Sequence, residues 1–333
     1  MTQLSHVKES RLLELLGYAS QYLVNNGSIP PNTPFNIFTQ STTSQTLPSY
    51  KYATLKFPKK GGIASLCFTG EFLITGSKDG MIEVWNYESG KLAPLSYQEE
   101  TPMMMSCRVL ALDARGDILV SASEKGQIKV WNISTGRCSA SFYAHETGIL
   151  SLKLSGDQVI SGGVDGIVKV FGLKSQTCLK VLRGHTSFVN SVDVLDNEIW
   201  SAGSDGAVKR WSGGECLQTF FFRDEKLVNE AYGSIDYLKC TSLGIIIGTR
   251  EVTYLIKNET IVQTWKTKGG VSWDVINDKI YILDEQGDLS LFTPSRKEGE
   301  MMQIGRGSLI ARHVIKNILA CLTDSGNISL WKK

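Results

Sequence analysis

Residues 183–211 read RGHTSFVNSVDVLDNEIWSAGSDGAVKRW, and this segment decides the fold. It contains three short runs typical of β-strands, VNSVDVL, EIWSAGS and AVKRW. The last two flank Ser204-Asp205-Gly206, which predicts a tight hairpin turn because glycine accepts the positive φ that such a turn needs. A unit of this kind has an unpaired edge and two apolar faces, so further copies of it should cover those faces.

Copies of this unit recur at an interval of roughly 40 residues. In each copy a glycine lies five residues before an aromatic residue, and apolar and polar residues alternate between them. The pairs are Gly80/Trp85, Gly126/Trp131, Gly166/Phe171, Gly206/Trp211, Gly287/Phe292 and Gly326/Trp331. A seventh, degenerate copy has Thr249-Arg250-Glu251 at the turn and Ile256 at the aromatic position. A Gly-His pair before the unit and a tryptophan at its end are typical of WD repeats, so the sequence predicts an all-β, seven-bladed WD-repeat β-propeller.

An amphipathic helix is predicted ahead of the repeats, at residues 8–25, because leucines and other apolar residues recur there at helical spacing. Its apolar side packs either on the propeller rim or against a partner. We therefore predict two parts, residues 1–47 with the helix and a linker, and residues 48–333 with the propeller. The last repeat has no sequence left for an outer strand, so residues 50–57 are predicted to supply that strand and close the ring.

The composition is that of an ordinary globular protein. The 333 residues carry a formal net charge of +2, with 42% hydrophobic and 20% charged residues, so nothing in the bulk charge demands nucleic acid or a membrane surface. No apolar run approaches the ~18 residues of a transmembrane helix, and the N-terminus lacks the apolar stretch of a signal peptide. The seven cysteines show no C-x-x-C spacing and are interpreted as small hydrophobic residues, which favours a reducing compartment.

Four polar residues of the fourth repeat stand where WD repeats place a hydrogen-bonded chain: His185, Ser201, Asp205 and Trp211. We interpret this tetrad as structural, because each buried polar group in it satisfies the next. A Ser/His/Asp set also invites a hydrolase interpretation, but no G-x-S-x-G elbow is present and a serine bonded to an indole is not an exposed nucleophile. With no P-loop, no G-x-G-x-x-G and no metal-ligand spacing, we predict no catalytic, cofactor or metal site, no small-molecule substrate and hence no enzyme.

Candidate contact residues come from two features. The long connection 92–108 carries Met103, Met104 and Met105, flexible apolar side chains that suit a protein contact or else fold down over the propeller. Alignment of the repeats places Arg108, Phe188 and Leu309 just before inner strands, where large side chains act as contact anchors. The candidate partner-binding residues are therefore Met103, Met104, Met105, Arg108, Phe188 and Leu309.

Two basic features have competing interpretations. Arg210 occupies a strand position that holds Val or Leu in five other repeats, so either its stem packs and its guanidinium reaches the rim, or it pairs with a carboxylate of a neighbouring blade. A basic surface for RNA is offered by Lys56, Lys59, Lys60 and Arg108. Few aromatic residues interleave with these charges, so RNA contact is predicted to be indirect or weak.

Several stretches share motifs with one particular family: RLLELLGYASQYLVNNGSIPP (11–31), LKFPKKG (55–61), FLITGSKDGMIEVWN (72–86), PMMM (102–105), GQIKVWNISTGRC (126–138) and GLKSQTCLKVLRGHTSFVN (172–190). On these residues the chain resembles the spliceosomal Smu family of WD-repeat proteins, homologues of the suppressor of mec and unc. The most specific of the stretches are the helix with its Pro-Pro exit, the methionine triplet, and GLKS followed by RGHTSFVN.

The resemblance implies a non-enzymatic nuclear scaffold of pre-mRNA splicing that binds spliceosomal proteins during spliceosome activation, alongside a partner called Red. The family has a LisH/CTLH helical region ahead of its propeller, and this chain shows only the final helix of that region. Red binding and self-association by that route are therefore left open. The kinship with CTLH proteins implies an alternative, a substrate-recognition adaptor of a ubiquitin ligase. In both hypotheses a rigid disc presents contact patches at fixed angles.

Overall fold

The structure is a computed structural model. It describes residues 50–55, 62–86, 91–92, 105, 107–222, 233–267, 269–276, 279–284, 286, 288–293, 300–303, 307–313, 318–323 and 328–332. The chain divides into two compact units, Met1–Gln45 and Thr46–Lys333, and all of the described residues lie in the second. The division predicted from the sequence, between residues 47 and 48, stays a prediction.

The described strands form seven four-stranded antiparallel sheets, which we number along the chain. Sheet 1 contains β2 (Ile63–Thr69), β3 (Phe72–Ser77), β4 (Ile82–Asn86) and β5 (Lys91–Leu92). Sheet 2 contains β6 (Val109–Arg115), β7 (Ile118–Ser123), β8 (Gln127–Asn132) and β9 (Cys138–Tyr143). Sheet 3 contains β10 (Ile149–Ser155), β11 (Gln158–Gly163), β12 (Ile167–Gly172) and β13 (Cys178–Arg183).

The remaining sheets continue in the same order. Sheet 4 contains β14 (Val189–Leu195), β15 (Glu198–Gly203), β16 (Ala207–Ser212) and β17 (Glu215–Phe221). Sheet 5 contains β18 (Tyr237–Thr241), β19 (Gly244–Gly248), β20 (Val252–Lys257) and β21 (Thr260–Lys266). Sheet 6 contains β22 (Gly270–Ile276), β23 (Lys279–Asp284), β24 (Asp288–Phe292) and β25 (Glu300–Gln303). Sheet 7 contains β26 (Gly307–His313), β27 (Ile318–Thr323), β28 (Ile328–Lys332) and, from the start of the unit, β1 (Tyr50–Leu55).

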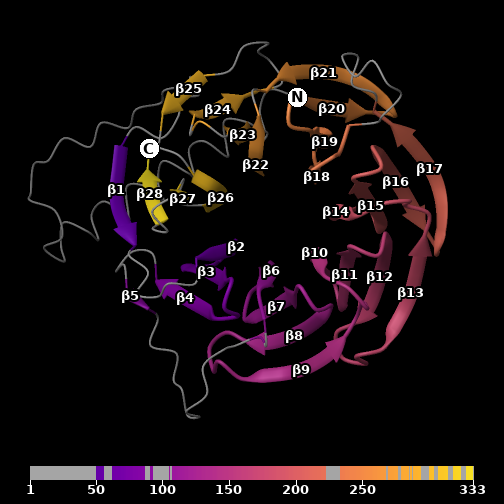
Figure 1. The fold of residues 1–333 in the computed structure, drawn as a ribbon, viewed down its shortest axis with the longest axis horizontal. Helices are drawn as coiled ribbons and strands as arrows, with labels where there is room; N and C mark the ends of the chain where they lie inside the picture. The colour runs from indigo at the N-terminus through magenta and orange to yellow at the C-terminus, as the bar shows by residue number, and fades with distance from the viewer. Residues whose placement is uncertain are drawn as a thin grey trace, which may run out of the picture. The chain divides into compact units, whose positions relative to one another are not determined.

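The sheets of this unit stand around a common centre. In each, the first of its consecutive strands lies innermost (β2, β6 and β10, for example), while strands such as β9, β13 and β17 lie at the rim (Figure 1). Each inner strand contacts the inner strand of the next sheet, and β26 contacts β2, so the series closes on itself. This arrangement is a β-propeller, in which radial repetition leaves only short strand edges at the rim.

Closure joins the two ends of the unit. The strand predicted at residues 50–57 is β1, Tyr50–Leu55, and it pairs antiparallel with β28. Its register runs from Tyr50 opposite Lys332 to Leu55 opposite Ile328, with one irregularity between Lys51 and Ala53. The outer strand of sheet 7 therefore comes from the opposite end of the sequence to the other three, which covers an edge of β28 that would otherwise be bare.

The predicted fold class is corrected in its helical part. All of the regular elements among the described residues are strands, and none is a helix. The helix predicted at residues 8–25 and the linker that follows it lie outside the described residues. The architecture established for the described part of the chain is the all-β propeller of the sheets given above.

Glycines make the turns between the second and third strands of the early sheets. Gly80, Gly126, Gly166 and Gly206 all have positive φ, between 71° and 92°. At Gly126 a Cβ atom would also lie only 2.0 Å from the carbonyl oxygen of His145, which lies in the connection from β9 to β10. A side chain at this position would therefore force apart the turn and the neighbouring loop.

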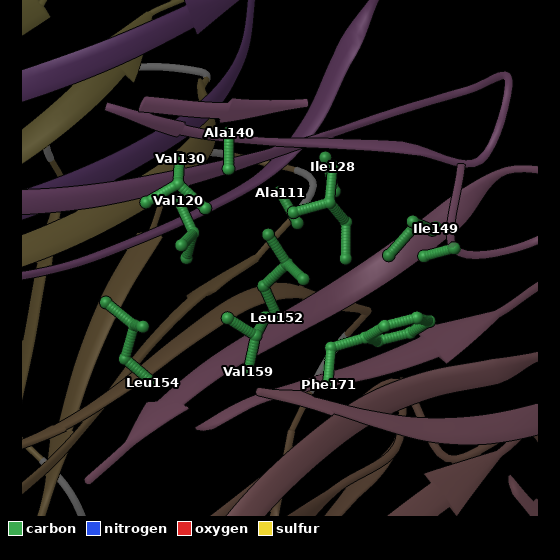
Figure 2. Close-up of a cluster of buried hydrophobic side chains, with 12 residues drawn as sticks. Ala111, Val120, Ile128, Val130, Ala140, Ile149, Leu152, Leu154, Val159 and Phe171 are labelled. Atoms are coloured by element: carbon green, nitrogen blue, oxygen red, sulfur yellow. The ribbon is translucent and has the colours of Figure 1, made fainter. Parts of the chain in front are cut away.

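The core lies between neighbouring sheets. Figure 2 shows the cluster between sheets 2 and 3, where side chains such as Val120, Ile128 and Phe171 point toward one another from the two sheets. Because each sheet is covered on both faces, its inner and middle strands carry buried residues of both alternating sets. The second strands, such as β7, are therefore buried along most of their length, whereas the third strands, such as β8, keep an alternation of buried and partly exposed residues.

Serine side chains of the inner strands link neighbouring sheets. Ser65, Ser151 and Ser191 share one register position, opposite Gly76, Gly162 and Ala202. Ser65 and Ser191 donate to the carbonyl oxygens of Val109 and Leu238 at 3.1 Å each, and Ser151 accepts from the Val192 N–H at 3.0 Å. These bonds cross from sheet 1 to 2, from 4 to 5 and from 3 to 4, and each satisfies a buried backbone group.

Sheets 5 and 6 meet in a different way. Tyr237 takes the serine position and stacks on Trp273 of sheet 6, with ring centroids 6.0 Å apart. The Trp273 indole donates to Thr253 Oγ1 of sheet 5 at 3.1 Å. A Cβ on Gly248 or Gly270 would come within 2.6 Å of this indole, so the two glycines make the space that the aromatic pair occupies.

Candidate functional site

The tetrad of sheet 4 forms a continuous hydrogen-bonded chain. His185 Nδ1 lies 3.0 Å from both carboxylate oxygens of Asp205, and His185 Nε2 lies 2.8 Å from Ser201 Oγ. The Trp211 indole donates to the same hydroxyl at 2.8 Å. Burial raises the pKa of Asp205, but the bond to His185 and the backbone N–H of Thr186 outweigh it and lower that pKa overall. Ser201 is fully buried, so its hydroxyl cannot meet a substrate.

Sheet 3 repeats this chain without the indole. His145 Nδ1 lies 2.8 Å from Asp165 Oδ2, and His145 Nε2 lies 2.8 Å from Ser161 Oγ. Phe171 stands at the tryptophan position and offers no N–H. Burial of the imidazole lowers the pKa of His145, and the bond to Asp165 opposes that shift without reversing it. A neutral ring donates from Nδ1 to the carboxylate and accepts the serine proton at Nε2.

His145 predicts a loss of stability on acidification. Its folded pKa lies below the ~6.5 of an unfolded histidine, so the unfolded chain binds the proton more readily. The stability that it contributes is complete above about pH 6.5 and is lost as pH falls through the folded pKa. Urea denaturation of wild type and His145→Gln between about pH 7.5 and 5.5 should show a smaller acid loss in the variant. Parallel curves for the two proteins would contradict this assignment.

Sheet 2 carries a variant of the same chain that corrects one candidate contact residue. Trp131 Nε1 donates to Ser121 Oγ at 2.8 Å, and Ser121 Oγ lies 3.1 Å from the Met105 sulfur. Met105 precedes Ser121 by the same 16 residues that separate His185 from Ser201. It therefore replaces the histidine in the core, and with 1% of its surface exposed it is not available to a partner.

The other candidate contact residues fall into three groups. Met103 and Met104 lie outside the described residues. Arg108 and Phe188 lie immediately before the inner strands β6 and β14, as the repeat alignment predicts. Leu309 pairs with Leu322 inside β26, at the register position of Ser191, so the alignment that placed it just before the strand is wrong.

We define the loop face as the side of the propeller that carries the turns between second and third strands and the entries to the inner strands. Backbone bonds join these two sets, from the Ser204 N–H to the Phe188 carbonyl at 2.9 Å and from the Glu124 N–H to the Arg108 carbonyl at 3.1 Å. Phe188 is 48% exposed on this face. Arg108 Nε lies 3.9 Å from Glu124 Oε2, so its charge has a local partner. The other residues of the predicted RNA surface, Lys56, Lys59 and Lys60, lie outside the described residues.

A hollow of about 390 Å³ opens on the loop face at sheet 5. Phe222, Val252 and Tyr254 give it an apolar wall, and the rings of Phe222 and Tyr254 lie 5.1 Å apart. The hollow is also lined by polar groups, those of Ser234, Asp236, Thr249, Arg250 and Glu251. Asn190, two residues after Phe188, donates to Ser234 Oγ at 3.2 Å, so the hollow lies one sheet from the exposed phenyl ring. An apolar wall with polar groups around it fits a side chain of a protein partner.

Arg210 acts within the fold and across a sheet boundary. Its guanidinium bonds both oxygens of Glu198 in the neighbouring strand, at 2.6 and 2.9 Å, and reaches Glu259 of sheet 5 at 3.4 Å. It also lies over the Trp200 ring, 5.7 Å from its centroid. The second of the two interpretations, a carboxylate partner in a neighbouring blade, therefore holds in part, alongside a bidentate pair within the same sheet.

Charged residues alternate around a central cavity of about 330 Å³. One register position on consecutive inner strands holds Asp113, Lys153, Asp193, Lys239 and Asp274. Asp193 contacts residues of both neighbouring sheets. Its carboxylate lies 3.1 Å from Lys153 Nζ and 3.9 Å from Lys239 Nζ, and it accepts from the Cys240 N–H at 2.9 Å. Burial lowers the pKa of Lys153, but the carboxylates of Asp193 and Asp113 outweigh it and raise that pKa. The alternation therefore joins sheets 3, 4 and 5 by charge.

The described residues contain no group of three or more His, Cys, Asp or Glu side chains that could hold a metal ion. None of the elements in that part of the chain is a helix with the length and apolar character needed to cross a bilayer.

Comparison with known proteins identifies repeats and one partial relative. The WD domain, G-beta repeat family matches residues 51–86, 136–172 and 176–212, so WD40 repeats are present. The WD40 repeat-containing protein smu1 of Dictyostelium discoideum is 34% identical over 110 residues, which span 30% of this chain and 21% of that protein. The crystal structure of the computationally designed protein Ika8 superposes with a TM-score of 0.64, covering 81% of this chain and 83% of the designed chain. At 19% identity, that likeness shows the fold alone.

Proposed function

We propose that this WD-repeat propeller is a non-enzymatic scaffold of pre-mRNA splicing, which binds spliceosomal proteins in the nucleus during spliceosome activation. The proposal rests on the 34% identity to the smu1 protein over 110 residues, because this identity agrees with the resemblance of the sequence motifs to the Smu family. The match covers only part of both proteins, so binding to a Red-like partner and action during spliceosome activation are proposed along with the scaffold role.

The mechanism is presentation by a rigid surface. Phe188 is a half-exposed aromatic side chain on the loop face, and the hollow at sheet 5 lies one sheet away. Aromatic side chains at the centre of a polar surface dominate the binding energy of many interfaces. Because serine bonds and the Asp193 ion pairs fix neighbouring sheets to one another, both features keep their separation when a partner binds. Binding then costs little conformational entropy.

Affinity purification from nuclear extract tests the proposal. Wild-type protein is expected to recover splicing proteins, and a Phe188→Ala/Arg108→Ala variant is expected to recover several-fold less, because truncating an anchor residue costs about 2 kcal/mol or more. Ile118→Ala is the matched control, since Ile118 is 39% exposed and starts β7 opposite Arg115, at the other end of that strand from its loop-face turn. Its recovery should equal that of wild type.

Three results count against the proposal. Recovery of cullin or RING subunits in place of splicing proteins would favour the ubiquitin-ligase adaptor. Turnover of a small substrate would favour an enzyme. Equal loss of partners in the loop-face variant and the Ile118→Ala control would remove the loop face as the binding surface.

A further inference from the structure

Exposed large apolar side chains gather on the outer strands of sheets 3 to 6. Among the described residues they are Leu179 and Val181 on β13, Leu217 and Phe221 on β17, Ile261 and Val262 on β21, and Met301 on β25. Each is between 44% and 61% exposed. Apolar side chains left in solvent in this number mark a surface for protein contact.

The strand β21 carries a charge only at its end. Residues 260–265 are uncharged and Lys266 is its last residue, whereas β13 carries Lys180 and Arg183. Natural proteins place charges on sheet edges to prevent further strands from adding. The middle of the β21 edge has no charge, Val262 lies there in a bulge between Ile261 and Gln263, and none of the described strands pairs with this edge.

β9 is also uncharged, but it differs from β21 at the decisive position. Val262 follows Ile261, which pairs with Ile256, just as Ser139 follows Cys138, which pairs with Trp131. The two strands therefore share a register in which β9 has a small polar side chain and β21 has a β-branched one. This makes Ser139 a matched control for Val262.

A hollow of about 350 Å³ follows the same strand. It is lined by the consecutive residues Ile261, Val262, Gln263 and Thr264. Ile261 and Val262 are 52% and 49% exposed, so an added strand that brings apolar side chains to this edge would cover apolar surface there. Lys266 ends β21, and Lys257 ends the neighbouring strand β20 opposite Thr260. Both are exposed, and their charges favour carboxylates at the ends of the bound segment.

We propose that the outer edge of β21 binds an extended segment of a partner protein as a fifth strand of sheet 5. The segment spans about five residues, alternates β-branched with polar side chains, and carries acidic residues at its ends. Backbone hydrogen bonds to the open edge give the affinity, and the cover over Ile261 and Val262 gives the specificity. This rim site is independent of the loop face.

A fluorescein-labelled peptide, Glu-Val-Thr-Ile-Thr-Glu, tests the site by fluorescence anisotropy with the full chain. Saturable binding is expected, and Val262→Lys should weaken it about tenfold or more, because it places a charge on the edge. Val262→Thr keeps the β-branched shape and should retain binding. Ser139→Lys, at the same register on β9, should leave it unchanged. Val262 is half-exposed, so each variant should unfold at the wild-type temperature.

Charge reversal supplies a second variant that does not depend on Val262. Lys266→Glu should weaken the acidic peptide and strengthen Lys-Val-Thr-Ile-Thr-Lys, since the lysine is exposed. Hydrogen exchange should show protection of the amides at residues 260–265 when the acidic peptide binds. The proposal fails if wild type does not bind the peptide, if protection appears elsewhere, or if Val262→Lys binds as wild type does. It also fails if Val262→Lys instead abolishes a concentration-dependent dimer, because the edge would then join two copies of this chain.

Discussion

A chain that begins at residue 56 is expected to aggregate and to lose cooperative unfolding. Removing β1 leaves the outer edge of β28 bare and deprives sheet 7 of its fourth strand. Sheet 7 joins sheet 6 to sheet 1, so destabilising it also weakens the closure of the ring. The loss is comparable with the net stability of a domain, about 5–15 kcal/mol. Thermal denaturation and size-exclusion chromatography measure both effects.

The control for this truncation is a chain that begins at residue 46. It retains β1 and the whole of the second compact unit, Thr46–Lys333. It should unfold in one cooperative transition. A chain from residue 56 that stays monomeric and unfolds cooperatively would show that the ring does not depend on β1.

Replacing Asp193 by alanine is expected to give the largest loss of stability among single substitutions in the central cavity. The side chain is buried, and its removal leaves Lys153 and Lys239 without their shared carboxylate and the Cys240 N–H without its acceptor. Breaking a buried pair costs about 3–5 kcal/mol, and because both lysines are partly exposed we expect about 3 kcal/mol. Urea denaturation at pH 7 measures the loss.

Two further variants separate charge from hydrogen bonding in this effect. Asp193→Asn keeps an acceptor for the Cys240 N–H and should cost less than alanine, about 1–2 kcal/mol. Asp157→Ala removes a carboxylate that lies 3.9 Å from Lys174 in an ion pair with both side chains largely exposed, and it should change stability by less than about 0.5 kcal/mol. Equal losses for Asp193→Ala and Asp157→Ala would show that the central carboxylate is no more than a surface charge.

Strands and turns of sheets 1 to 4 could be predicted from the sequence because their signals are local. A glycine turn and an alternating strand lie within a few residues of one another, as at Gly206 and Trp211. The hydrogen-bonded tetrad was predictable for the same reason, since its His, Ser and Asp recur at the same intervals in the third and fourth repeats. The intervals are the same even where one position of the repeat holds a different residue type.

Met105 shows how residue type misled the prediction. Methionine in a long connection indicates a contact surface, yet Met105 lies 40 residues before His145 and 80 before His185. The interval alone identifies it as the histidine position of sheet 2, where a thioether fills the space of an imidazole. Leu309 was misplaced because four residues join β26 to β27 where two join β14 to β15, and the repeat pattern does not reveal such an insertion.

The junction between sheets 5 and 6 could not have been predicted from the sequence alone. Tyr237 and Trp273 look like departures from the repeat when each is considered separately. Their role is the ring stacking that joins the two sheets, and this stacking needs Gly248 and Gly270 to leave room for the indole. A pattern along one strand contains no information on which side chains face one another across a sheet boundary.

The pairing of β1 with β28 also constrains how the chain is made in the cell. During synthesis β1 leaves the ribosome first among the strands, but its partner is translated only after six complete sheets. Until then the nascent protein holds an open arc with two bare ends, and contacts of such long sequence separation form slowly. A chaperone that shields strand edges during translation should therefore raise the yield of this protein more than that of a domain whose neighbouring strands are consecutive in sequence.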